Sequence, residues 1–102
     1  MYKPRVLVVD DEKAIRWSLE KQLVRRGYMV ETVESGEDAL ENFTRNPADL
    51  VLLDIILPGI DGISVLNQLK RLSDSVAVIM ITSAMALDTA IQAMKAGAND
   101  YV

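Results

Sequence analysis

Short apolar segments of this chain alternate with amphipathic segments of helical periodicity, and this alternation narrows the fold more than any other feature. Apolar runs of strand length lie at residues 5–9, 49–54 and 76–82, an alternating edge-like strand is expected at residues 29–33, and a further strand begins at residues 100–102. Strands that alternate with helices in this way are typical of a parallel sheet with helices on both of its faces. The sequence therefore predicts an α/β fold.

The helical segments carry apolar residues three or four positions apart. In residues 13–26, Ile15, Leu19 and Leu23 form one stripe that Gly27 is placed to end, and Trp17 lies outside it, so we expect this side chain to be half exposed. Ser35 and Asp38 begin a second helix, which Asn46-Pro47 breaks. A third follows the Pro58-Gly59 turn with Ile63, Leu66 and Leu69, and a fourth is predicted at residues 87–96 with Ile91 and Met94 facing inward.

Four polar residues fall at the carboxyl ends of the predicted strands. Asp10 and Asp11 follow the first strand, Asp54 ends the third, and Thr82 ends the fourth. In open parallel sheets ligands bind beyond these ends. An Asp at such a place often caps the next helix instead, but Leu57-Pro58-Gly59 separates Asp54 from any helix. Three carboxylates in one crevice repel each other, and a divalent cation relieves the repulsion, so we expect a Mg²⁺ site.

Composition limits the function classes. The 102 residues fit one domain spanning 1–102, and half of them are hydrophobic, which excludes disorder. A net charge of -4 argues against direct nucleic-acid binding. Absence of His excludes a histidine phosphocarrier, and the apolar runs are too short for a membrane span. Absence of Cys fits a reducing compartment, so a cytoplasmic location is expected.

Two enzyme or carrier classes with related architecture fit poorly. An aspartate-nucleophile phosphatase needs a second acid two residues after Asp54, where this chain has Ile56. A flavin carrier needs a hydroxyl- and glycine-rich phosphate loop after the first strand, and Asp10-Asp11-Glu12 would repel the phosphate.

The chain resembles the receiver domains of two-component response regulators along its whole length. The matching motifs are Val8-Val9-Asp10-Asp11-Glu12, Leu53-Asp54-Ile55-Ile56-Leu57-Pro58-Gly59-Ile60-Asp61-Gly62, Ile79-Met80-Ile81-Thr82-Ser83-Ala84 and Ala96-Gly97-Ala98-Asn99-Asp100-Tyr101. The resemblance implies a flavodoxin-like, doubly wound parallel sheet of five strands in the order 2-1-3-4-5. Residues 14–19 and 89–98 further resemble receivers of sigma-54-dependent transcription activators.

The resemblance also implies a role for each site residue. Asp54 matches the phosphoacceptor, and Asp11 and Asp54 match the direct carboxylate ligands of Mg²⁺. Asp10 matches the acid that holds the ion through water, and Ile56 matches the position that ligates through its backbone carbonyl. Thr82 matches the hydroxyl that binds a phosphoryl oxygen, and Tyr101 matches the aromatic switch. The Ile56 side chain either packs or leaves an attacking water without a polar partner, which would lengthen the life of the phosphoryl group.

The implied partners follow from the same resemblance. A histidine kinase or phosphotransfer protein would supply the phosphoryl group, and a downstream output domain, such as a sigma-54-activator ATPase with a DNA-binding domain, would read it. No membrane partner and no independent enzymatic turnover are expected. The resemblance therefore implies a phosphorylation-dependent switch, and the alternative is a receiver-shaped protein-interaction module that is not phosphorylated efficiently.

The end of the sequence is the one departure from the family pattern. Receivers carry a Lys-Pro pair about three residues beyond Tyr101 and then a fifth helix, whereas the sequence ends at Val102. An end in mid-strand favours truncation, with the fifth strand incomplete and the fifth helix absent. The face that this helix shares with the first helix would then be bare, and a homodimer would cover it.

Overall fold

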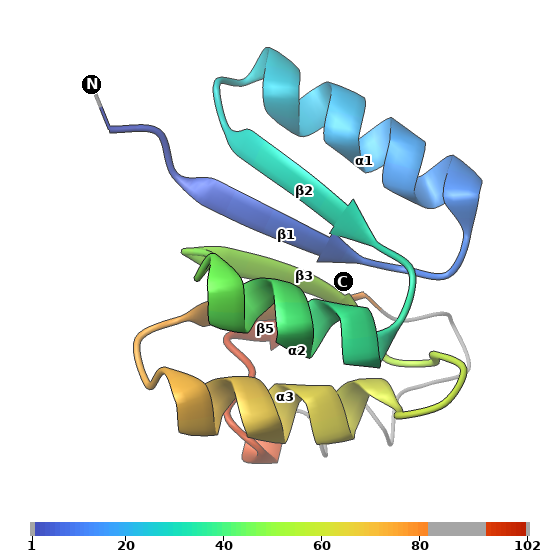
Figure 1. Cartoon of the computed structure of the whole chain (residues 1–102), viewed down its shortest axis with the longest axis vertical. Helices are drawn as coiled ribbons and strands as arrows, with labels where there is room; N and C mark the ends of the chain where they lie inside the picture. The colour runs from blue at the N-terminus through green and yellow to red at the C-terminus, as the bar shows by residue number, and fades with distance from the viewer. Residues whose placement is uncertain (1, 82–93, 102) are drawn as a thin grey trace.

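A computed structural model describes residues 2–81 and 94–101 of the chain, with the side chain of Tyr101 left out. Its centre is a parallel sheet of five strands in the order β2-β1-β3-β4-β5 (Figure 1). The strands are β1 (Arg5–Val9), β2 (Met29–Val33), β3 (Leu50–Asp54), β4 (Ala77–Ile81) and β5 (Asp100–Tyr101). The predicted strand order is confirmed, and β2 is an edge strand.

Three described helices cover the sheet from both sides. They are α1 (Lys13–Arg25), α2 (Gly36–Arg45) and α3 (Gly62–Leu72). Figure 1 shows α1 on one face and α2 and α3 together on the other, so the sheet is doubly wound as predicted. In the part of the chain that the structure describes, none of these helices is long and apolar enough to cross a bilayer.

The fourth predicted helix falls mainly on residues outside the described ranges, Ile91 among them. Its last residues are described, and they correct one prediction: Met94, expected to face inward, is exposed over 40% of its surface. Ala96 packs against the core instead, and the Gly97 N–H donates to the Met94 carbonyl at 3.2 Å. The apolar face therefore turns away from Met94 in the final turn of this helix.

Local sequence signals explain where the helices start and stop. Ser35 caps α2 by accepting a hydrogen bond from the Asp38 N–H at 3.1 Å, and Asp61 caps α3 by accepting from the Ser64 N–H at 2.9 Å. Gly27, with a φ of 96°, takes the left-handed conformation just after α1. Ser35 and Asp61 thereby satisfy N–H groups that the start of a helix leaves unpaired, and Gly27 allows the backbone to turn out of the helix at its end.

The core lies between the sheet and the helix pair α2 and α3. Its members are apolar side chains of β1, β3, β4, α2, α3 and the adjoining loops, among them Leu7, Val9, Phe43, Val51, Leu53, Leu66, Leu69, Val78 and Met80. Helix α1 differs, because none of its residues is fully buried. Trp17 on this helix is 59% exposed, with the Lys21 Nζ 4.6 Å from its ring centroid, and Val24 is also exposed.

One side chain sets the start of the β4–β5 pairing. The Asn99 N–H donates to the Val78 carbonyl at 2.8 Å, and the Asn99 Oδ1 accepts from the Val78 N–H at 2.8 Å. Lys70 from α3 also donates to the Asn99 Oδ1, at 3.3 Å, and to the Val76 carbonyl at 2.6 Å. These bonds fix the register in which β5 brings Tyr101 opposite Met80.

Glu31, the central residue of β2, links this edge strand to β1 and to the end of α2. Its carboxylate accepts hydrogen bonds from the Asn42 side chain at 2.7 Å, from Asn46 at 3.3 Å and from the Arg5 guanidinium. The Asn42 bond and then the contact with Arg5 lower the pKa of the Glu31 carboxyl. Such a group stabilises the fold where it is ionised in both states, and this contribution is lost as pH falls through the folded-state value.

We predict that Glu31→Gln lowers the free energy of unfolding at neutral pH by about 1 kcal/mol, because a partly exposed ion pair with added hydrogen bonds contributes on that order. The deficit should shrink as pH falls below the usual glutamate range, about pH 4. Thermal melts across this pH range check it. Glu41→Gln, which removes an exposed ion pair with Arg45 at 3.9 Å, is the matched control and should change little. A deficit that persists at low pH would contradict the role of ionised Glu31.

Candidate functional site

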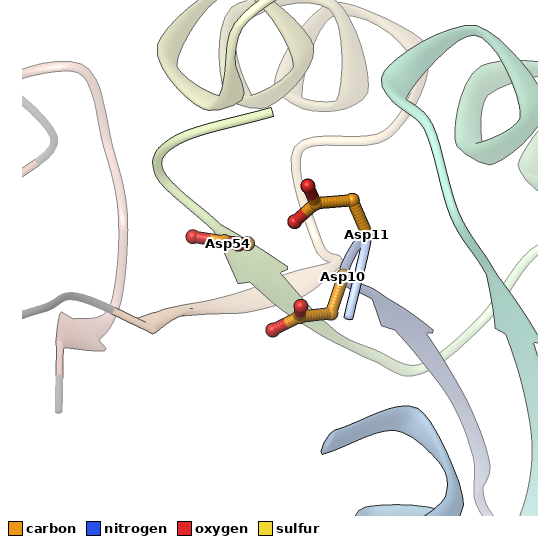
Figure 2. A group of neighbouring side chains, drawn as sticks. All are labelled: Asp10, Asp11 and Asp54. Atoms are coloured by element: carbon orange, nitrogen blue, oxygen red, sulfur yellow. The ribbon is translucent and has the colours of Figure 1, made fainter. Parts of the chain in front are cut away.

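The three acidic residues predicted to converge do so at the carboxyl ends of β1 and β3. Each of Asp10, Asp11 and Asp54 offers one carboxylate oxygen, and these oxygens all lie within 4.8 Å of one another. Figure 2 shows Asp10 and Asp11 just beyond the tip of β1, with Asp54 at the tip of β3. The pairing of Val9 with Leu53 places the next residues of the two strands, Asp10 and Asp54, side by side.

Asp10 is the most deeply buried of the three, with 1% of its surface exposed. Its Oδ1 accepts from the Glu12 N–H at 2.9 Å, its own N–H donates to the Val33 carbonyl at 3.1 Å, and its carbonyl accepts from the Arg16 guanidinium at 2.8 Å. Burial raises the pKa of the Asp10 carboxyl, and the charge of Asp11 adds to the rise. The Glu12 hydrogen bond and the nearby Arg16 charge oppose this rise but do not cancel it.

Asp54 is partly buried, and its Oδ1 accepts from the backbone N–H of Ile56 at 3.1 Å. Burial raises the pKa of the Asp54 carboxyl to about 6, and the charges of Asp10 and Asp11 add to the rise against the Ile56 hydrogen bond. Asp11 is exposed and completes the cluster from the solvent side. The site therefore holds more negative charge than its own hydrogen bonds offset.

None of the three acids caps any of the helices that the structure describes. The N-cap of α1 is Glu12, whose side chain makes no cap hydrogen bond, and the N-cap of α3 is Asp61. The structural explanation of these acids as capping residues is therefore wrong for this chain. Their carboxylates point into a shared space instead of toward helix ends (Figure 2).

The donor set fits a hard divalent cation. It consists of carboxylate oxygens, which Mg²⁺ prefers, and one of the three residues is solvent-exposed, which leaves room for the waters that Mg²⁺ retains. A bound cation would also favour the ionised form of Asp54, whose pKa lies near neutrality. We therefore assign the cluster as a candidate metal site on the chemistry of its donors.

The other predicted site residues are described to different extents. Ile56 is 65% exposed, so the prediction that its side chain simply packs is wrong, and its role as a carbonyl ligand stays a prediction. Thr82 lies outside the described residues, so its role also stays a prediction. The backbone of Tyr101 lies in β5, as predicted, while its switch role is untested.

Two residues around the cluster carry no predicted role in the sequence analysis. Gly62 begins α3 so close to the end of β3 that a Cβ there would lie less than 3.0 Å from the Asp54 carbonyl and 2.8 Å from the Ile55 Cα. Its own N–H donates to the Ile55 carbonyl at 3.0 Å. Arg16 reaches from α1 to the Asp10 carbonyl. Only the glycine had a sequence signal, its place four residues after Pro58 in a turn-rich stretch.

Comparison with known proteins places the chain in a family. Residues 6–102 match the family described as the response regulator receiver domain. The chain is 37% identical over 98 residues to the response regulator MprA of Mycobacterium sp. (strain KMS), with 96% of this chain and 43% of that protein covered. It is 40% identical over 95 residues to the DNA-binding transcriptional regulator NtrC of Klebsiella pneumoniae, with 93% of this chain and 20% of that protein covered.

Comparison with solved structures gives the same family as the sequence comparison. The receiver domain protein (CheY-like) from Methanospirillum hungatei JF-1 superposes with a TM-score of 0.94 at 31% identity, over 99% of this chain and 81% of that one. The chain belongs to the response regulator receiver family, a family of two-component signalling domains, and its predicted fold is confirmed. It spans less than half the length of the curated relatives named here.

We predict that Gly62→Ala destabilises the domain by roughly 2–3 kcal/mol, because the added methyl must displace backbone atoms of β3 in a packed region. Chemical denaturation measures the loss. Gly27→Ala is the matched control: it has a φ of 96° but no atom within 4 Å of the added carbon, so it should cost only about 1 kcal/mol of backbone strain. Equal losses in the two variants would show that the close approach at Asp54 does not matter.

Proposed function

We propose that this chain is a phosphorylation switch that accepts a phosphoryl group on Asp54 in a Mg²⁺-dependent reaction. The observation that carries the proposal is the convergence of Asp10, Asp11 and Asp54, with oxygens within 4.8 Å, at the tips of adjacent parallel strands. Membership of the receiver family supports the reaction type.

Asp54 is the acid best placed to be the nucleophile. It is partly buried at the tip of β3, whereas Asp10 is almost completely buried and therefore less accessible to a phosphoryl donor. One Asp54 oxygen accepts from the Ile56 N–H, and this bond orients the carboxylate. The second oxygen remains for attack on phosphorus, and positioning of this kind provides much of the catalysis in phosphoryl transfer.

Phosphoryl transfer to Asp54 forms one bond to phosphorus and breaks another. One Asp54 carboxylate oxygen bonds to the phosphorus of a phosphohistidine or small acyl phosphate, and the bond from phosphorus to the donor breaks. The leaving group keeps the electron pair of that bond, and an imidazole leaving group takes up a proton. The product is an acyl phosphate on Asp54.

Asp11 and Asp54 would hold Mg²⁺ directly, Ile56 through its carbonyl, and Asp10 through water. When bound, the ion supplies positive charge that offsets the repulsion between the acidic cluster and the phosphoryl oxygens. Thr82 would donate a hydrogen bond from its hydroxyl to a phosphoryl oxygen. Tyr101, on β5, would be the aromatic residue whose conformation changes on phosphorylation.

The proposed phosphoryl donor is a histidine kinase or a phosphotransfer protein, as family membership implies. The proposed reader is an output domain outside this sequence, since relatives are named as a response regulator and a DNA-binding transcriptional regulator. Such a relay would place the chain in the cytoplasm. Because the exposed Ile56 side chain offers no polar group to an attacking water, we propose a long-lived phosphoryl group.

We expect Asp54→Asn to abolish hydroxylamine-labile phosphate incorporation from acetyl phosphate and Mg²⁺, because the amide is not a nucleophile for phosphorus. Intact-mass measurement follows the gain of one phosphoryl group. Asp74→Asn, a change of the same charge at an exposed turn before β4, should label like the wild type. Wild-type protein that takes up no phosphate would favour the alternative of an unphosphorylated interaction module, and labelled Asp54→Asn would remove Asp54 from the role.

We expect Asp11→Asn to weaken Mg²⁺ binding by more than about tenfold, because a hard cation loses an anionic oxygen ligand. Titration calorimetry with MgCl₂ measures the change, and Asp74→Asn again controls for the loss of one negative charge. Unchanged affinity in Asp11→Asn would contradict the proposed ligand set.

A further inference from the structure

We propose that Arg16 is a positioning residue that sets Mg²⁺ affinity by fixing the peptide between Asp10 and Asp11 from behind the site. This inference rests on the proposed metal site. Its basis is one contact, the 2.8 Å hydrogen bond from the Arg16 guanidinium to the Asp10 carbonyl oxygen.

The position of Arg16 suits this role. Its side chain is only 17% exposed, so the guanidinium is held between α1 and the loops at the carboxyl end of the sheet. The Nη1 atom donates to the Asp10 carbonyl, while Nη2 lies 3.8 Å from the Glu34 carboxylate in the loop after β2. One planar group therefore links the loop that carries two site acids to the neighbouring loop.

The hydrogen bond from Arg16 supports the part of the site next to Asp11, whose carboxylate has no hydrogen bond of its own within the described residues. The Asp10 N–H is tied to the Val33 carbonyl, and its side chain is tied to the Glu12 N–H. Asp11 is exposed, and no hydrogen bond within the described residues holds its carboxylate. The orientation of the Asp10–Asp11 peptide therefore determines where the Asp11 carboxylate points, and Arg16 fixes the oxygen of that peptide.

An electrostatic role and a positioning role of Arg16 predict opposite changes in Mg²⁺ affinity when the residue is replaced. A cation behind an acidic site repels Mg²⁺, so removal of its charge alone would tighten binding. Loss of the anchor would loosen the ligand geometry and weaken binding, and the loss of such an outer partner costs 10–100-fold in other metal sites. Mg²⁺ demands stricter geometry than Ca²⁺, so loosening should weaken Mg²⁺ binding more.

The experiment titrates Mg²⁺ and, separately, Ca²⁺ into the chain and its variants by calorimetry. Arg16→Met, which keeps the aliphatic stem, should weaken Mg²⁺ binding about tenfold and lower the ratio of Mg²⁺ to Ca²⁺ affinity. Lys13→Met removes the same charge from the first turn of α1 and should leave Mg²⁺ affinity unchanged or slightly higher. Glu34→Gln should change it by less than about twofold, because the two groups are 3.8 Å apart and the Glu34 side chain is 69% exposed.

Wild-type or tighter Mg²⁺ binding in folded Arg16→Met overturns the inference, even if its melting temperature falls. If Arg16→Met does not fold, Arg16→Lys decides: its ammonium lacks the rigid fork of the guanidinium and holds the Asp10 carbonyl less firmly, so binding should weaken several-fold, and wild-type affinity overturns the inference. Wild-type protein that binds no Mg²⁺ contradicts the proposed function itself. Binding in the wild type with unaltered Arg16 variants contradicts only the role of Arg16.

Discussion

The parallel register between β1 and β3 is the constraint on which the rest of the site depends. Because Val9 pairs with Leu53, Asp10 and Asp54 are the adjoining residues at the two strand tips. A slip of one residue would turn the apolar side chains of β3 to the opposite face and bury different groups. The apolar packing of Leu7, Val51 and Leu53 therefore fixes the position of the acids, although no acid contributes to that packing.

The same register creates an electrostatic cost that the local backbone only partly offsets. Asp10 and Asp54 each accept one hydrogen bond from an N–H two residues ahead, at Glu12 and Ile56. These bonds orient the carboxylates, but burial still raises the pKa of both groups. The fold thus leaves uncompensated negative charge at the site while these hydrogen bonds orient the carboxylates. This combination suits a ligand that brings positive charge.

The sequence predicted most of the fold because its signals are local. Ser35 as a cap, Gly27 as a stop and the apolar strand runs each act over a few residues. The site acids were predictable because strand ends meet at one edge of the sheet. Gly62 and Arg16 were missed because their roles depend on how the chain folds back after a strand, which strand and helix periodicity does not show. Met94 was placed wrongly because a helical stripe does not show where the last turn of a helix leaves the core.

Helix α1 joins two properties that have a thermodynamic consequence. It has no fully buried residue, so the free energy of its local opening lies below that of global unfolding. It also carries Arg16, so each opening of the helix near that residue releases the Asp10 carbonyl. If cation binding needs that carbonyl held, Mg²⁺ protects the backbone amides of α1 from exchange. A molecule that binds the closed helix preferentially then strengthens Mg²⁺ binding, and Mg²⁺ strengthens the binding of that molecule by the same factor.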